Sequence, residues 1–159
     1  MNCPRKLSRA ERSGEPMKLQ GILIAHRDDP WVEAVVAFFR GEEYRITRTD
    51  SVGGLIKKVR SGEFHVLLLD EDLEGMKASE LVPLVKKINE RVQVIVVSSE
   101  GSLPSVRQLR RAGIFYHALK PVDMDELRSA VGCAFEKIER EHPVAEGFFP
   151  FWLAGRVTA

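Results

Sequence analysis

Five chemically useful side chains stand at the ends of short apolar runs in this 159-residue chain: His26, Arg27, Asp70, Ser98 and Lys120. Such runs are typical of strands that are buried on both faces of a parallel sheet. Functional groups in these sheets gather at the carboxyl ends of the strands, near the point where the strand order reverses. We therefore expect the five side chains to share one crevice, which offers a carboxylate, a hydroxyl and basic groups.

The elements that would position these side chains alternate between strands and amphipathic helices. The sequence predicts strands over residues 19–25, 44–49, 65–70, 92–98 and 114–118. Helices are predicted after each strand, beginning near Pro30 and Ser51 and covering 78–89, 104–112 and 123–141. Five strands alternating with five helices predict an α/β fold in which helices cover both faces of a parallel sheet.

Composition narrows the classes of function. The formal net charge is +1, from 24 basic and 23 acidic residues, so no overall field draws the chain to nucleic acid or to a membrane surface. No apolar run approaches the roughly 20 residues that span a bilayer, and residues 1–16 do not form a secretory signal. We expect a cytoplasmic protein in which Cys3 and Cys133 are reduced thiols.

Three segments, taken in order, resemble the receiver domains of two-component response regulators. They are HVLLLDEDLEGM (65–76), VIVVSS (94–99) and GIFYHALKPVDMDEL (113–127), within a stretch from about residue 18 to 140. The resemblance implies a flavodoxin-like (βα)5 three-layer sandwich with a central five-stranded parallel sheet. We expect residues 1–16 to be a disordered leader, 17–141 the receiver domain, and 142–159 an apolar tail that packs on the domain or on a partner.

The resemblance also implies roles for individual residues in a phosphorelay. Asp70 would accept a phosphoryl group from a histidine kinase or a phosphotransferase protein, since an ionised carboxylate attacks without a separate base. Lys120 would neutralise the phosphoryl oxygens, and Ser98 would donate its hydroxyl to them. His117 falls at the aromatic switch position, where it adds a titratable group. The Lys120–Pro121 peptide bond would be cis.

The sequence departs from the family at the end of the first strand, where two adjacent acids normally help to bind Mg²⁺. His26 and Arg27 occupy those positions when the apolar runs are aligned. Asp70, Arg27 and Lys120 together would carry a charge of +1, and repulsion on the scale of roughly 4 kcal/mol per pair would remove most Mg²⁺ affinity. A register anchored on Pro30 instead places Asp28 in the second acid position.

Two hypotheses follow from this departure. In the first, Arg27 pairs with Asp70, and the domain is a degenerate, phosphorylation-independent pseudo-receiver that acts as an interaction or dimerisation module. In the second, Asp28 and Asp70 bind Mg²⁺ and phosphotransfer survives. A small flavodoxin-like enzyme or ligand-binding domain is a further alternative, but the HRDDP turn (26–30) lacks a glycine-rich phosphate loop. We therefore do not expect an enzyme.

The surface expected to meet partners is the family's usual output face, built from the fourth helix, the fifth strand and the fifth helix. Arg107, Arg110 and Arg111 lie on that fourth helix. We expect a downstream effector protein, and a homodimer formed through this face or through the tail, whose FFPFWL segment (148–153) is strongly apolar. Direct contact with nucleic acid or a membrane is not expected.

Overall fold

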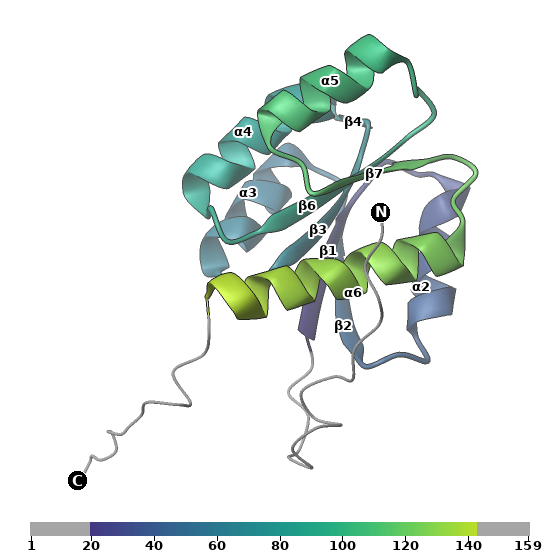
Figure 1. The fold of residues 1–159 in the computed structure, drawn as a ribbon, viewed down its shortest axis with the longest axis vertical. Coiled ribbons are helices and arrows are strands. Elements are labelled where there is room, and N and C mark those ends of the chain that lie inside the picture. The colour runs from purple at the N-terminus through teal and green to yellow at the C-terminus, as the bar shows by residue number, and fades with distance from the viewer. Residues whose placement is uncertain (1–19, 143–159) are drawn as a thin grey trace, which may run out of the picture.

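A computed structural model describes residues 20–142 of the chain. Its main sheet has five parallel strands in the order β2-β1-β3-β6-β7 (Figure 1). The strands are β1 (Gln20–Ala25), β2 (Tyr44–Thr49), β3 (Val66–Asp70), β6 (Gln93–Ser98) and β7 (Tyr116–Leu119). The strand order reverses between β1 and β3, which confirms a doubly wound parallel sheet.

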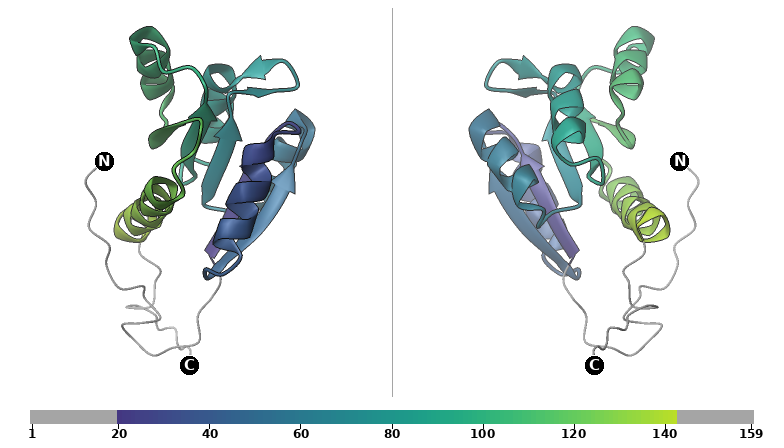
Figure 2. Two further views of the ribbon diagram at one scale, coloured as in Figure 1. Left: turned by 90° about the vertical axis from the view of Figure 1, so that its right-hand side faces the viewer. Right: turned by 90° about the vertical axis from the view of Figure 1, so that its left-hand side faces the viewer.

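Helices cover both faces of this sheet (Figure 2). One apolar core joins α2 and α6 to the sheet, and a second core joins α3, α4 and α5 to the opposite face. The bounds are α2 (Pro30–Phe39), α3 (Val52–Ser61), α4 (Ala78–Ile88), α5 (Leu103–Ala112) and α6 (Met124–Glu141). The predicted three-layer α/β sandwich is therefore confirmed. No helix within residues 20–142 is long and apolar enough to cross a membrane.

Local capping explains where the helices begin. Side-chain oxygens accept hydrogen bonds from free backbone N–H groups in the first turns of four helices, which satisfies donors that have no partner inside the helix. The helix α5 begins one residue before the predicted start, because Ser102 caps it. The capping residues are Asp29 for α2, Ser51 for α3, Ser102 for α5 and Asp123 for α6.

A short antiparallel hairpin that the sequence did not predict follows β3. It pairs β4 (Asp72–Leu73) with β5 (Met76–Lys77), and its turn places Glu74 and Gly75 at positive φ, 51° and 84°. The Glu74 carboxylate accepts a hydrogen bond of 2.6 Å from the backbone N–H of Val52, at the start of α3. The segment that leaves the carboxyl end of β3 is therefore tied to the sandwich rather than free.

The expectations for the cysteines and for the two ends of the chain have different outcomes. Cys133 on α6 is disulfide-bonded, so the expectation of a reduced thiol is wrong at this position. The proposed leader (1–16) and nearly all of the proposed tail (142–159) lie outside the described residues, and both remain predictions.

Candidate functional site

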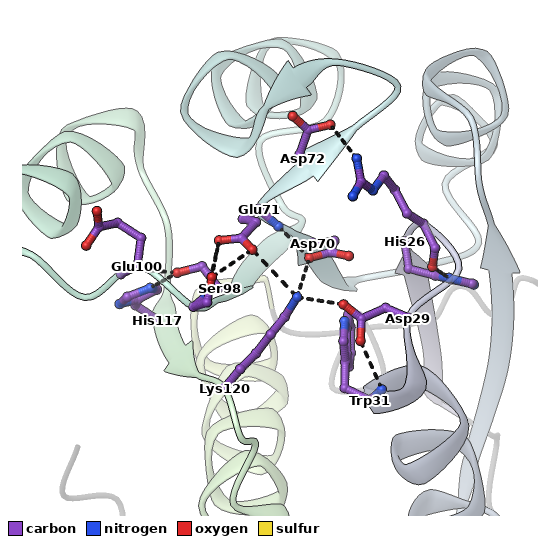
Figure 3. A network of polar contacts seen from close by, with 12 residues as sticks. His26, Asp29, Trp31, Asp70, Glu71, Asp72, Ser98, Glu100, His117 and Lys120 are labelled. Atoms are coloured by element: carbon purple, nitrogen blue, oxygen red, sulfur yellow. Dashed lines mark hydrogen bonds and ion pairs between the residues drawn. The ribbon is translucent and has the colours of Figure 1, made fainter.

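The sheet brings together three of the residues singled out by sequence. Asp70 ends β3, Ser98 ends β6 and Lys120 follows β7 directly, so all three lie at the carboxyl edge of adjacent strands (Figure 3). The backbone N–H of Lys120 donates to the carbonyl of Ser98 at 2.9 Å, which extends the β6–β7 pairing to the edge of the site. The Lys120–Pro121 peptide bond is cis, as the resemblance implied.

Asp70 is the most enclosed acid of the site, with 3% of the residue exposed. Its Oδ1 accepts hydrogen bonds from the backbone N–H of Glu71 at 2.8 Å and from Lys120 Nζ at 3.1 Å. No other side-chain hydrogen bond to Asp70 is made within residues 20–142. The buried carboxylate is therefore held through one oxygen, which leaves Oδ2 as the atom that can react or bind a ligand.

Asp29, which the sequence interpretation did not place in the site, lies beside Asp70. Its Oδ2 accepts a hydrogen bond of 2.8 Å from Lys120 Nζ, while Oδ1 caps α2 through the backbone N–H of Trp31 at 3.2 Å. Burial acts to raise the pKa of Asp29, but the hydrogen bonds from Lys120 and Trp31 and the positive charges of Lys120 and Arg27 outweigh it. The net effect lowers the pKa of Asp29, which stays ionised.

Lys120 links the acidic groups of the site. Its Nζ lies 2.8 Å from Asp29, 3.1 Å from Asp70 and 3.7 Å from Glu71. Burial acts to lower the pKa of Lys120, but hydrogen bonds to Asp29 and Asp70 and their charges raise it overall. Three carboxylates therefore face one ammonium group, so the predicted net positive pocket is wrong and the site is anionic.

The three residues expected to form the altered acid pocket lie around its rim. Arg27 has 66% of its side chain exposed and its guanidinium lies 3.8 Å from Asp72, so the predicted ion pair with Asp70 is absent. Asp28 is exposed and makes no side-chain hydrogen bond or ion pair within residues 20–142. The His26 ring is hydrogen-bonded to the backbone carbonyl of Arg27. Asp29, and not Asp28, is therefore the acid after β1 that contacts Lys120.

Ser98 and His117 form a separate hydrogen-bonded group on the other side of Lys120. Ser98 Oγ donates to the backbone carbonyl of Glu100 at 3.0 Å and lies 2.7 Å from His117 Nε2. Because the hydroxyl has a single proton, its donation to Glu100 assigns Nε2 as the protonated nitrogen of a neutral His117. Burial, followed by the charge of Arg110, lowers the pKa of His117, and Glu71 opposes this only in part.

The comparisons with known proteins agree with this geometry. The sequence profile of the response regulator receiver domain matches residues 22–132. The chain belongs to this family. Sporulation initiation phosphotransferase F from Bacillus subtilis is 35% identical over 66 residues, which make up 42% of this chain and 53% of that protein. Curated relatives of this receiver domain are longer than the match, since it covers between 23% and 53% of their length.

Solved structures share the fold of this receiver domain. A CheY-like receiver domain from Methanospirillum hungatei JF-1 superposes with a TM-score of 0.72 and 23% identity, covering 78% of this chain and 99% of that one. The beryllofluoride-activated receiver domain dimer of NtrC4 superposes with a TM-score of 0.69 and 19% identity, covering 74% of this chain and 98% of that one. At these identities the likeness establishes the α/β architecture alone.

The donor chemistry of the receiver site suits a hard divalent cation. Asp29 and Asp70 both contact the Lys120 ammonium group, and carboxylate oxygens are the ligands that Mg²⁺ prefers. The indole Nε1 of Trp31 is buried without a hydrogen-bond partner within residues 20–142, and a ligand oxygen would satisfy it. No group of three or more His, Cys, Asp or Glu residues in this range is arranged as a ready metal cage.

Sequence reasoning missed Asp29, Glu71 and Ser99, although a signal was present for Asp29. An Asp directly before a Pro at the first helical position is a typical helix cap, and a capping side chain is fixed in direction. Successive side chains of a strand point to opposite faces of the sheet, but Glu71 lies just after the end of β3. The direction of its side chain therefore cannot be predicted from this alternation. The contacts of Glu71 with Ser99 therefore carry no sequence signal.

The expected output face is exposed and partly apolar. Leu103 on α5 is 61% exposed and Leu119 on β7 is 50% exposed, and the predicted arginines of α5 (Arg107, Arg110 and Arg111) are exposed as well. The Tyr116 hydroxyl donates to Glu126 of α6. Burial, the hydrogen bond to Glu126 and nearby negative charge raise the pKa of Tyr116 to about 12, so the phenol stays neutral and joins β7 to α6.

Proposed function

We propose that Asp70 is a phosphoacceptor that takes a phosphoryl group from a histidine kinase or a phosphotransferase protein. One contact carries the proposal: the Lys120 ammonium lies 3.1 Å from Oδ1 of a carboxylate that is only 3% exposed. A buried acid with a fixed positive charge beside it keeps its ionised, nucleophilic form and has a counter-charge ready for the transferred group. Family membership supports the same role.

The transfer uses the free oxygen of Asp70. Oδ2 attacks phosphorus, the P–N bond to the partner's histidine breaks, and its electron pair remains on the histidine nitrogen. The acyl phosphate that forms carries its charge on the three non-bridging oxygens. Lys120, already hydrogen-bonded to Oδ1, offsets part of that charge, and the Glu71 backbone N–H keeps the carboxyl group oriented. Asp29 holds Lys120 from the opposite side.

Mg²⁺ is part of the proposal, with Asp29 and Asp70 as its protein ligands in place of Asp28. The metal would supply positive charge beside the transferred phosphoryl group. Three carboxylates around one ammonium group leave an excess of negative charge, which favours a cation. This replaces the expectation that the metal is lost, because that expectation placed Arg27 in the pocket.

The output of the switch is a protein surface. Ser98 is hydrogen-bonded to Glu100 and His117, away from Asp70, so binding a phosphoryl group requires the hydroxyl to rotate and frees His117. His117 lies on β7, within the α5–β7–α6 face that carries exposed Leu103 and Leu119. We propose that this face binds an effector protein or a second copy of the chain; the NtrC4 receiver domain, which shares the fold, forms a dimer.

The proposed setting is a cytoplasmic signalling chain without enzymatic turnover or direct contact with nucleic acid. The alternative of a phosphorylation-independent pseudo-receiver depended on an ion pair between Arg27 and Asp70, and Arg27 contacts Asp72 instead. The disulfide at Cys133 is unusual for the cytoplasm. Thiol titration of the purified protein under native and reducing conditions tests whether Cys133 is oxidised.

The deciding experiment is incubation with acetyl phosphate and Mg²⁺, followed by intact mass spectrometry. The full chain should gain one phosphoryl group, and the Asp70→Asn variant should gain none. Asp72→Asn is the matched control, since it removes an acid from the neighbouring hairpin and should still be modified. Failure to label the folded wild-type chain, or equal labelling of Asp70→Asn, would refute Asp70 as the acceptor.

A further inference from the structure

Glu71, the residue after the proposed phosphoacceptor, has a carboxylate that is held by donors from two neighbouring strands. The backbone N–H of Ser99 donates to Oε1 at 3.1 Å, and the Ser99 hydroxyl lies 3.2 Å from Oε1 and 3.1 Å from Oε2. Lys120 Nζ lies 3.7 Å from Oε2 (Figure 3). A backbone amide, a hydroxyl and an ammonium group thus converge on one anionic group.

The residues that carry these donors lie at the ends of two neighbouring strands. Ser99 directly follows β6, and Lys120 directly follows β7, where its backbone N–H is fixed to the Ser98 carbonyl at 2.9 Å. Preorganised backbone and side-chain donors of this kind bind the oxygens of carboxylates and phosphates alike. The donors therefore form an oxyanion site, and in this structure a side chain of the same domain fills it.

The site is shared with Asp70. Lys120 contacts Glu71 and Asp70 with the same ammonium group, at 3.7 Å and 3.1 Å. A phosphoryl group on Asp70 would bring further negative charge within reach of Lys120 and Ser99. Like charges at contact distance repel, so the Glu71 carboxylate and a phosphoryl group cannot both keep these donors.

We infer that Glu71 is an internal competitor that occupies an oxyanion site made by Ser99 N, Ser99 Oγ and Lys120 Nζ. The ligand it excludes is a tetrahedral oxyanion, either inorganic phosphate or the phosphoryl group on Asp70. The phosphoryl case rests on the function proposed above, and the inorganic phosphate case does not.

The side chain of Glu71 can leave the oxyanion site while its backbone stays in place. Its backbone N–H is anchored to Asp70 Oδ1 at 2.8 Å, while 36% of its side chain is exposed. Rotation of the side chain alone would release the Ser99 amide and hydroxyl to a new anion. Glu71 thus acts as a positioning residue: it keeps the donors in an anion-bound arrangement before modification and sets a threshold for phosphorylation.

The first test measures binding of inorganic phosphate to the full chain, followed through the amide NMR signal of Ser99. Glu71→Gln and Glu71→Ala should each bind phosphate at least about tenfold more tightly than wild type, because both remove the charge that competes for Lys120 and Ser99. Glu74→Gln is the matched control: it removes one charge from the same loop, and Glu74 contacts Val52 instead. Its affinity should equal that of wild type.

The second test measures the rate of phosphorylation by acetyl phosphate over a range of donor concentrations. Both Glu71 variants should be modified faster, by at least about tenfold at low donor concentration, and the rates should converge with wild type as the donor saturates the site. A purely structural role of Glu71 would change the saturated rate or the melting temperature instead.

The two tests separate the two proposals. Tighter phosphate binding in the Glu71 variants without any phosphorylation would refute Asp70 as acceptor and leave the oxyanion site standing. Phosphorylation at equal rates in wild type, Glu71→Gln and Glu71→Ala, with unchanged phosphate affinity, would overturn the inference and leave the phosphoacceptor standing.

Discussion

Different kinds of interaction stabilise the groups on the two sides of the Lys120 ammonium group. On one side, Asp29 and Asp70 contact Lys120 at 2.8 and 3.1 Å, and these contacts are between full charges. On the other side, Ser98 connects His117 to the Glu100 carbonyl through hydrogen bonds between neutral groups. We call these the acid side and the switch side.

This difference assigns separate tasks to the two sides. Hydrogen bonds between charged groups are stronger than neutral ones, so in the proposed mechanism the acid side would hold its geometry before the phosphoryl group is transferred. The switch side can rearrange at a smaller cost, because each neutral hydrogen bond contributes only about 1 kcal/mol net. A receiver needs both properties, since one group must stay fixed while the other changes partners.

The largest predicted effect comes from removing the charge that joins the acid side. Lys120→Met should slow phosphorylation by acetyl phosphate on the order of 10²–10³-fold, as expected for loss of a preorganised positive group. It should also destabilise the fold by about 2 kcal/mol, less than for a fully buried pair because 20% of the Lys120 side chain is exposed. Mass-spectrometric rates and urea unfolding measure the two effects.

Arg27→Met is the matched control for that variant. It removes a cation that is 66% exposed and lies 3.8 Å from Asp72, so both phosphorylation and stability should stay close to wild type. If Arg27→Met instead accelerated phosphorylation while Lys120→Met had little effect, Arg27 would be the cation that controls Asp70, and the acid side as defined here would be wrong.

The next prediction concerns which acid completes the acid side. Asp29→Asn should weaken the Mg²⁺ response of Trp31 fluorescence by about tenfold, because one carboxylate ligand is lost. The amide oxygen can still cap α2, so the helix should survive. Asp28→Asn changes an exposed side chain and should leave Mg²⁺ affinity unchanged. The reverse order of effects would restore Asp28 as the ligand.

The lowered pKa of Asp29 adds a pH signature to this pair of variants. The pKa in the folded state lies below the ordinary value of 3.8, so the stabilising contribution of Asp29 is present above about pH 4 and is lost as pH falls through the folded pKa. Acid unfolding of Asp29→Asn should therefore begin from a lower stability at neutral pH and converge with wild type in acid. Asp28→Asn should follow the wild-type curve.

The strength of the strand and helix signals explains why the sheet could be predicted from sequence. The β3 and β6 segments are fully buried and apolar apart from Asp70, Gln93 and Ser98 at their ends, and the caps at Ser51 and Asp123 mark their helices. Strand ends follow from these patterns, which is why Asp70, Ser98 and Lys120 were placed correctly at one edge.

The acid side was not predictable in the same way. Alignment of the apolar run of β1 assigned positions 26 and 27 by counting, but the backbone between Ala25 and Pro30 does not continue the strand. A loop of this length has more than one path, and the path taken depends on the tertiary attraction between Asp29 and Lys120, 91 residues apart. The exposed Arg27 instead forms an ion pair with Asp72, which lies on a hairpin that the sequence did not predict.

The smallest predicted effect tests the switch side. The pKa of His117 lies below the ordinary value of 6.5, so between those two values the unfolded chain binds more protons than the folded one, and stability rises with pH. The folded state should thus lose stability as pH falls below about 6.5. In His117→Gln the side-chain amide can still donate to Ser98 Oγ without titrating, so this pH dependence should become flatter. Urea midpoints between about pH 5 and pH 7.5, together with NMR titration of the His117 ring, measure the difference.

An unchanged pH dependence of stability in His117→Gln would show that another residue is the titrating group. If Asp29→Asn removed that dependence instead, the acid side would be the pH-sensitive one, and the division of labour between the two sides would be reversed. If neither variant changed the pH dependence of stability and the His117 ring titrated near 6.5, folding and the hydrogen bond to Ser98 would not shift the pKa of His117. A flatter curve in His117→Gln alone would place the titrating group next to Ser98, where the proposed phosphoryl group on Asp70 would draw the hydroxyl away.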